Sequence, residues 1–182
     1  MLRRRRLAIA ACGLFGAGAG VHPDTVYAGT DAVPIGLKAP DSQVLAISAH
    51  ATGAQIYTCT PDKDQPTRFA WILKAPEAVL SDHSGRTLGK HYGGPTWEAT
   101  DGSKVVGEVI ATIDAPGGTS IPWLLLRARS TSKTGVFSAI ASIQRVRTHG
   151  GTAPATGCDK DTAGHEARVP YSAEYLFYAA RP

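Results

Sequence analysis

The chain has 182 residues, with 19 Lys and Arg against 15 Asp and Glu, so its formal net charge is +4. This length is typical of a single domain. Hydrophobic residues make up 43% and charged residues 19%, which excludes a chain that is disordered by composition. The 20 Gly and 12 Pro argue against a helical bundle. The isoelectric point near 9.1 suggests binding to nucleic acid or to a membrane surface, depending on where the basic residues lie.

Residues 1–28 have the layout of a secretory signal peptide. Four arginines at 3–6 precede the apolar run 7–21. In residues 26–28 (VYA), a β-branched Val and a small Ala occupy the −3 and −1 positions of a cleavage site before Gly29. The apolar run is too short and too rich in glycine for a good membrane span. Two alternatives are an uncleaved anchor and a lipid attached to Cys12, and the export route (Sec, twin-arginine or lipoprotein) stays open.

Removing this signal peptide lowers the net charge of the chain. Four arginines and one aspartate leave with it, so 15 basic and 14 acidic residues remain and the net charge is +1. Binding to nucleic acid or to a membrane surface therefore loses its support. We expect an exported protein, periplasmic or extracellular, with no membrane span in the mature chain, and the sequence does not indicate its oligomeric state.

The mature chain begins with an expected extended lead-in at 29–42, and the pattern then predicts short strands. Residues 43–49 and 54–59 have the spacing of a hairpin around His50–Gly53. Residues 69–74 alternate Phe, Trp and Leu on one face and end before Pro76.

The second half of the chain continues in the same way. Asp101-Gly102 is a strong hairpin signal between the runs 95–99 and 104–113. Residues 121–128 suit a buried strand or a core helix, 136–146 are interpreted as one short helix although they also tolerate a strand, and 168–179 are expected to form the last strand. The fold class is therefore mainly β: a single-domain antiparallel β-sandwich or barrel over 43–182, with room for that short helix.

Cys59 and Cys158 are the two cysteines that remain after cleavage. An even pair in an exported protein predicts a disulfide. The alternative is two unpaired buried thiols, because the sequence alone does not place the two residues within bridging distance.

Several motifs spread over most of the mature chain form a recognisable set. They are GAQIY with Cys59, APEA at 75–78, GPTWEA at 94–99 with DGS, IPWLLL at 121–126, IQRV at 143–146, GCD at 157–159 and VPY at 169–171. Together they resemble the DUF3455 family of exported proteins of unknown function from bacteria and fungi. The resemblance implies a single domain with paired cysteines. It implies no catalytic residues, because none are established for the family.

The densest group of chemically capable side chains is His91, Tyr92, Trp97 and Glu98, with Asp101 close by. A bend at Gly-Gly-Pro (93–95) would direct His91, Trp97 and Glu98 into one pocket, where a Trp face beside a carboxylate and an imidazole suits a small molecule or a glycan. The structural alternative keeps Trp97 in the core, Glu98 in solvent and Asp101 in its turn.

The expected function is a binding or structural module. The alternative is an exported, hydrolase-like enzyme in which His91 and Glu98 move protons. Against it, the chain has no G-x-S-x-G nucleophile motif. We expect no metal site and no cofactor, because the histidines lack a paired spacing and no P-loop is present.

Overall fold

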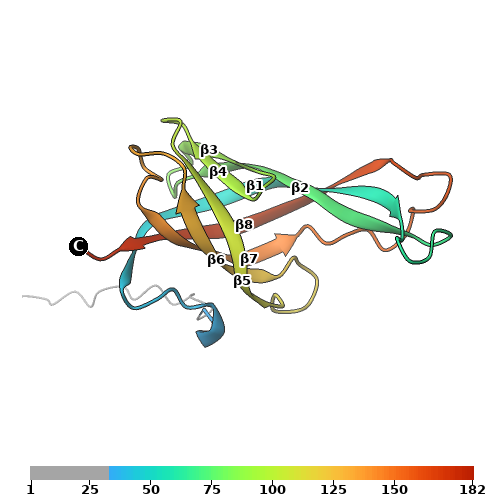
Figure 1. The fold of residues 1–182 in the computed structure, drawn as a ribbon, viewed down its shortest axis with the longest axis horizontal. Helices are drawn as coiled ribbons and strands as arrows, with labels where there is room; N and C mark the ends of the chain where they lie inside the picture. Colours follow the sequence, from blue (N-terminus) through green and yellow to red (C-terminus); the bar gives the residue numbers. More distant parts are fainter. Residues whose placement is uncertain (1–32) are drawn as a thin grey trace, which may run out of the picture. The chain divides into compact units, whose positions relative to one another are not determined.

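Eight antiparallel strands close into a barrel in the computed structural model, which describes residues 33–182 (Figure 1). Neighbouring strands follow chain order and β8 pairs back with β1. A short 3-10 helix, η1 (Ile35–Leu37), precedes the strands β1 (Gln43–Pro61), β2 (Phe69–Ser81), β3 (Thr87–Tyr92), β4 (Thr96–Ala99), β5 (Lys104–Ile113), β6 (Trp123–Ser130), β7 (Ile140–Gly150) and β8 (Glu166–Ala180). The predicted signal peptide at 1–28 lies outside the described residues.

Every second side chain along the strands points into the barrel, and these side chains fill its interior. On β8, Tyr171, Ala173, Tyr175 and Phe177 are buried, and the residues between them are partly exposed. Because successive side chains of a strand point to opposite faces, this pattern gives the barrel one apolar inner surface. The inner core also contains Ala49, Ala51, Leu80, Trp97, Val105, Leu126, Phe137 and Ile143.

A second, smaller core lies outside the barrel wall. Leu37 of η1 is fully buried against Trp123, Leu125 and Val146. The side chain of Gln144 donates a hydrogen bond from Nε2 to the Leu37 carbonyl. The part of the predicted lead-in that the structure describes, 33–42, is therefore packed onto β6 and β7 through this apolar contact.

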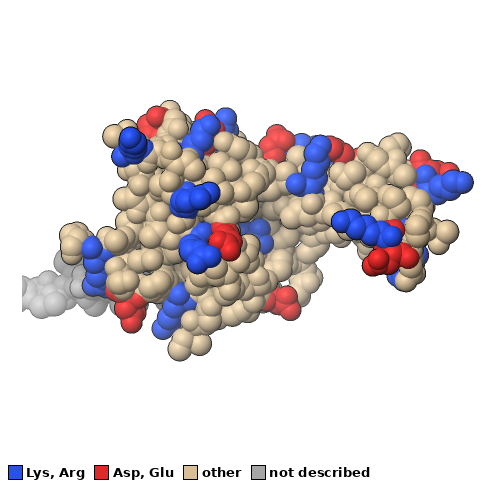
Figure 2. Space-filling model, in the orientation of Figure 1, with Lys and Arg blue, Asp and Glu red and all other residues tan. Residues whose placement is uncertain are grey.

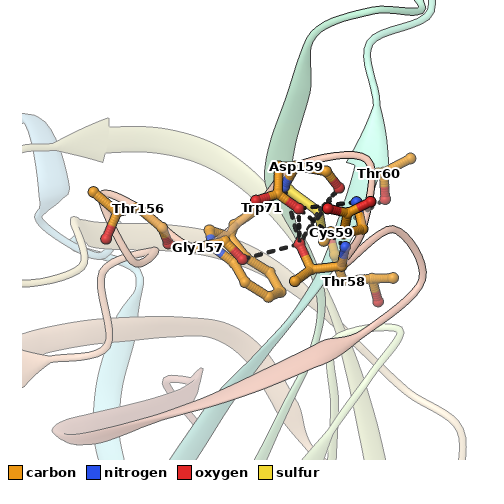
Figure 3. The surroundings of a disulfide bond; sticks show 10 residues. Thr58, Cys59, Thr60, Trp71, Thr156, Gly157 and Asp159 are labelled. Carbon is orange, nitrogen blue, oxygen red and sulfur yellow. Dashed lines mark hydrogen bonds between the residues drawn. A yellow bond between two sulfur atoms is a disulfide. The ribbon is translucent and has the colours of Figure 1, made fainter.

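Three strands extend beyond the barrel as an arm. The far ends of β1, β2 and β8, with the 151–165 loop, form this projection (Figure 1). The disulfide between Cys59 and Cys158, with Cα atoms 5.3 Å apart, confirms the predicted pairing and ties the loop to β1. Beside it, Trp71 Nε1 donates to the Thr156 carbonyl at 2.9 Å (Figure 3). The loop is therefore held at two points along the arm.

The predicted interruptions of the first two strands are wrong. β1 runs without a break through Gly53, and a Cβ there would lie 2.1 Å from the Glu77 carbonyl oxygen, so this glycine permits close contact with β2. β2 likewise continues through Pro76. At that position β2 pairs only with β1, because its ladder with β3 begins at Ala78, and a residue without an N–H is tolerated on such an open side.

The short helix predicted at 136–146 is also wrong, because β7 occupies Ile140–Gly150. Its backbone pairs with β6 on one side and β8 on the other, so the N–H and C=O groups on both edges of the strand have hydrogen-bond partners. The apolar spacing of Val136, Ile140 and Ile143 matched a helical face only by coincidence, since Val136 is exposed before the strand begins. The predicted hairpin turn at Asp101-Gly102, between β4 and β5, and the predicted strand at 168–179 are confirmed. Of the two alternatives for 121–128, the strand is correct, because most of this segment belongs to β6.

Candidate functional site

A cavity of about 290 Å³ lies within the barrel near the turn that joins β3 to β4. These two strands have only six and four residues, so the wall is short here and Gly93, Gly94 and Pro95 line the cavity. Every strand contributes to the lining: Gln55, Leu73–Pro76, His91, Trp97, Val109, Leu124, Leu126, Arg145 and Tyr175. Barrel closure therefore brings together side chains from the whole length of the domain.

His91 and Trp97 form the aromatic part of the lining. They are paired across β3 and β4, and their rings stack at 4.3 Å with an interplanar angle of 9°. Tyr175 meets both rings edge-on. The predicted Gly-Gly-Pro bend is present as the hairpin turn, with Gly94 at a φ of 103° that favours glycine. The bend thus brings these two of the predicted site residues together.

Burial sets the protonation state of His91. The residue is 2% exposed, and burial lowers the pKa of its imidazole to about 4, so the ring is neutral at neutral pH. Its Nδ1 lies 2.9 Å from the Thr96 carbonyl oxygen, which can only accept a hydrogen bond. Nδ1 must therefore carry the proton, and Nε2 is left as an unprotonated acceptor.

Three other polar side chains of the lining are buried without a hydrogen-bond partner within 33–182. Both amide atoms of Gln55 are unpaired although the residue is 1% exposed, and so are Trp97 Nε1 and the Tyr175 hydroxyl. A buried polar group without a partner costs about 1–3 kcal/mol of stability. Such groups are uncommon in folded proteins, and their clustering on one cavity points to a function there.

Arg145 is the half-buried cation of the lining. Its Nε and Nη2 donate to the Pro122 carbonyl at 3.1 and 2.9 Å. Lys74 also lines the cavity, but it forms an ion pair with Glu166. The lining contains no carboxylate among the residues that the structure describes, so Arg145 has no acidic partner there.

Tyr92 and Glu98 lie on the opposite, outer face of the same two strands. The Tyr92 hydroxyl donates to Glu98 Oε2 at 2.8 Å, and Lys90 and Lys104 approach the same oxygen at 3.5 and 3.3 Å. The hydrogen bond from Tyr92, followed by the two lysines, lowers the pKa of Glu98. The prediction that Glu98 converges with His91 and Trp97 is wrong, because adjacent residues of a strand point to opposite faces.

The outer face has no dominant charge on the side seen in Figure 2. Basic and acidic side chains are interspersed there. This mixture agrees with the near-neutral charge expected of residues 29–182. It offers no support for a nucleic-acid-binding surface on that face.

Asp101 organises the turn between β4 and β5. Its Oδ1 accepts from the Ser103 backbone N–H and hydroxyl at 2.9 and 2.6 Å, and its Oδ2 accepts from the Val136 N–H at 2.8 Å. These hydrogen bonds, that from the Ser103 hydroxyl first, lower the pKa of the Asp101 carboxyl. The structural alternative from the sequence therefore describes Asp101 correctly, and it also places Trp97 in the core.

Sequence reasoning missed Gln55, Arg145 and Tyr175 as site residues. Gln55 and Tyr175 stand in predicted strands, where a polar side chain at a core-facing position was the available signal. Arg145 stands in the segment that is predicted as a helix, where the alternation of a strand does not assign its side chain to the inner face. The three residues come from β1, β7 and β8, and only the closed sheet brings them to one cavity.

Comparisons with known proteins give one match. Residues 40–179 match a family model described as "Protein of unknown function (DUF3455)". The comparisons with curated proteins and with solved structures gave no match. In the described part of the chain, no three His, Cys, Asp or Glu side chains are grouped as a metal site would require. No helix of residues 33–182 has the length and apolar character to cross a membrane.

Proposed function

The chain belongs to the DUF3455 family of proteins of unknown function, and we propose that it binds a small molecule in its barrel cavity. The observation that carries this proposal is Gln55, which lines the cavity, is almost fully buried and has no hydrogen-bond partner within the described residues. A purely structural core would gain stability from an apolar side chain at this position. A bound ligand that hydrogen-bonds to the amide would offset the cost of burying it.

The enzyme alternative built on His91 and Glu98 has less support. The two side chains lie on opposite faces of the β3–β4 hairpin, so they do not act on one substrate. In addition, an imidazole with a pKa near 4 is a weak general base at neutral pH. Binding therefore fits the geometry better than hydrolysis does.

A glycan is also a poor fit to the site. Carbohydrates stack on an exposed aromatic face, whereas Trp97 is 1% exposed, with His91 stacked on one side and Tyr175 and Phe177 against it. The cavity equals the liquid volume of about ten water molecules, which suits a ligand of about ten non-hydrogen atoms. The proposed ligand is thus a compact small molecule.

We propose further that residues 1–28 direct export, that 29–42 are the lead-in, and that 43–182 act as the single binding domain in the periplasm or outside the cell. The Cys59–Cys158 disulfide supports this location, because disulfides persist in oxidising compartments. Expression in a bacterial host followed by N-terminal sequencing tests it. Exported protein that begins at Gly29 is the expected result, and intact protein retained in the cytoplasm would contradict it.

Binding in the cavity can be tested by amide NMR with small fragments. Phenol, indole and phenylacetamide are titrated into ¹⁵N-labelled protein purified without reductant. We expect at least one of them to shift the amides of His91, Gly94 and Leu126. Ala75→Phe, which narrows the cavity, should abolish these shifts, and Ala70→Phe on the exposed arm part of β2 should not. No shifts, or shifts that persist in Ala75→Phe, would refute the proposal.

A further inference from the structure

The polar groups of the cavity favour an anionic ligand. Arg145 is a cation at the wall, and Gln55 Nε2, Trp97 Nε1 and the Tyr175 hydroxyl are donors without a partner in the described chain. The available acceptors are fewer, and none of them is a carboxylate. A partly desolvated cation is unfavourable unless an opposite charge accompanies it. The protein residues that the structure describes do not supply that charge.

Arg145 is held so that it can receive such a partner. The Pro122 carbonyl accepts hydrogen bonds from Nε and Nη2 and fixes the guanidinium plane. A guanidinium has five N–H groups, so three remain after these two bonds. Their planar arrangement matches the two oxygens of a carboxylate, and hydrogen bonds between charged groups are about twice as strong as neutral ones.

Resting on the proposed binding function, we propose that the ligand is a small monocarboxylate with an apolar body, whose carboxylate pairs with Arg145. A single negative charge matches the site, because His91 is neutral and Lys74 is already paired with Glu166. The apolar body occupies the remaining wall, which Leu124, Leu126 and the aromatic rings provide.

The decisive comparison uses two ligands of equal size that differ in charge. Phenylacetate and phenylacetamide each have ten non-hydrogen atoms, as the cavity volume suggests. Binding is measured by isothermal titration calorimetry on the full chain, purified without reductant. We expect phenylacetate to bind at least about tenfold more tightly than the amide, the usual effect of a charge-assisted hydrogen bond.

Substitution of the cation tests the assignment to Arg145. Arg145→Met should weaken phenylacetate binding by about tenfold or more and should weaken phenylacetamide binding by less, because the amide brings no opposite charge to the guanidinium. Arg127→Met is the matched control, because Arg127 pairs with Glu108 on the exposed face of β6. It should leave both affinities unchanged, as should Glu98→Gln on the outer face of β4.

The outcomes separate this inference from the proposed function. Equal affinities for the two ligands, both abolished by Ala75→Phe, would overturn the monocarboxylate while leaving the binding cavity intact. If neither phenylacetate nor phenylacetamide binds while phenol or indole still shifts the cavity amides, the monocarboxylate is likewise overturned and the binding cavity stands. Failure of every fragment would overturn both proposals.

If Arg145→Met does not fold, a measurement on the wild-type protein tests the proposal instead. Intermolecular nuclear Overhauser effects then locate the bound phenylacetate. Contacts from its methylene protons to the Arg145 side chain support the proposal. Contacts that place the carboxylate end at Leu73 and Val109, on the exposed apolar part of the lining, overturn it.

Discussion

The buried imidazole of His91 should make the protein lose stability in mild acid. Burial lowers its pKa from an ordinary value of about 6.5 to about 4 in the folded chain. Below pH 6.5 the unfolded chain therefore takes up a proton that the folded chain does not, and the free energy of unfolding decreases as the pH falls toward 4. From these two pKa values, linkage gives a loss of about 2 kcal/mol between pH 7 and pH 5 from this one group.

Urea denaturation at pH 7, 6 and 5 measures this loss. In His91→Asn the side-chain amide can still donate to the Thr96 carbonyl but does not titrate, so this variant should lose about 2 kcal/mol less than wild type over the same range. His83→Asn, in an exposed turn, is the control that should follow wild type. If wild type and His91→Asn lose the same free energy, burial does not hold the His91 imidazole neutral.

Two further predictions concern stability. Replacing Cys59 and Cys158 by Ser should lower the free energy of unfolding by about 2–5 kcal/mol, because the bond joins positions 99 apart, and an unchanged urea midpoint would contradict this. Gly107→Ala should cost about 1–3 kcal/mol, because its Cβ would lie 2.9 Å from the Trp97 ring. Thermal denaturation should show little change for the control Gly36→Ala, where the nearest atom is 3.6 Å away, and equal shifts in both variants would refute the packing argument.

Local signals in the sequence determined the fold class and part of its detail. The richness of 168–179 in aromatic residues predicted a strand, which is present within β8. Asp101-Gly102 predicted a hairpin, and the structure has one, although only Gly102 of the pair has a positive φ, of 82°. The pairing of Cys59 with Cys158 was predicted from the expected export and from the even number of cysteines that remain after cleavage. Each of these features depends on neighbouring residues or on composition, which the sequence states directly.

Two errors about the strands show what local signals do not contain. Gly53 and Pro76 resemble breaks when each is read alone, yet β1 and β2 continue through them. Cross-strand hydrogen bonds and the close approach of the two backbones decide the conformation at these positions. The residues that pair with these two positions are more than 20 positions away in the sequence, so a local sequence pattern contains no information about this stabilisation.

The site itself was decided by tertiary structure. The spacing of His91 and Trp97 correctly suggested that their side chains lie close together. Which face of the sheet each side chain occupies followed only from the β3–β4 pairing, which places Glu98 on the outer face. Gln55 and Arg145 are 90 positions apart in the sequence and line one cavity because β8 closes the sheet between β1 and β7. The sequence alone thus determined a mainly β chain with one cysteine pair, and it predicts export. Barrel closure decided which polar side chains share its interior, because inward and outward positions alternate with every residue.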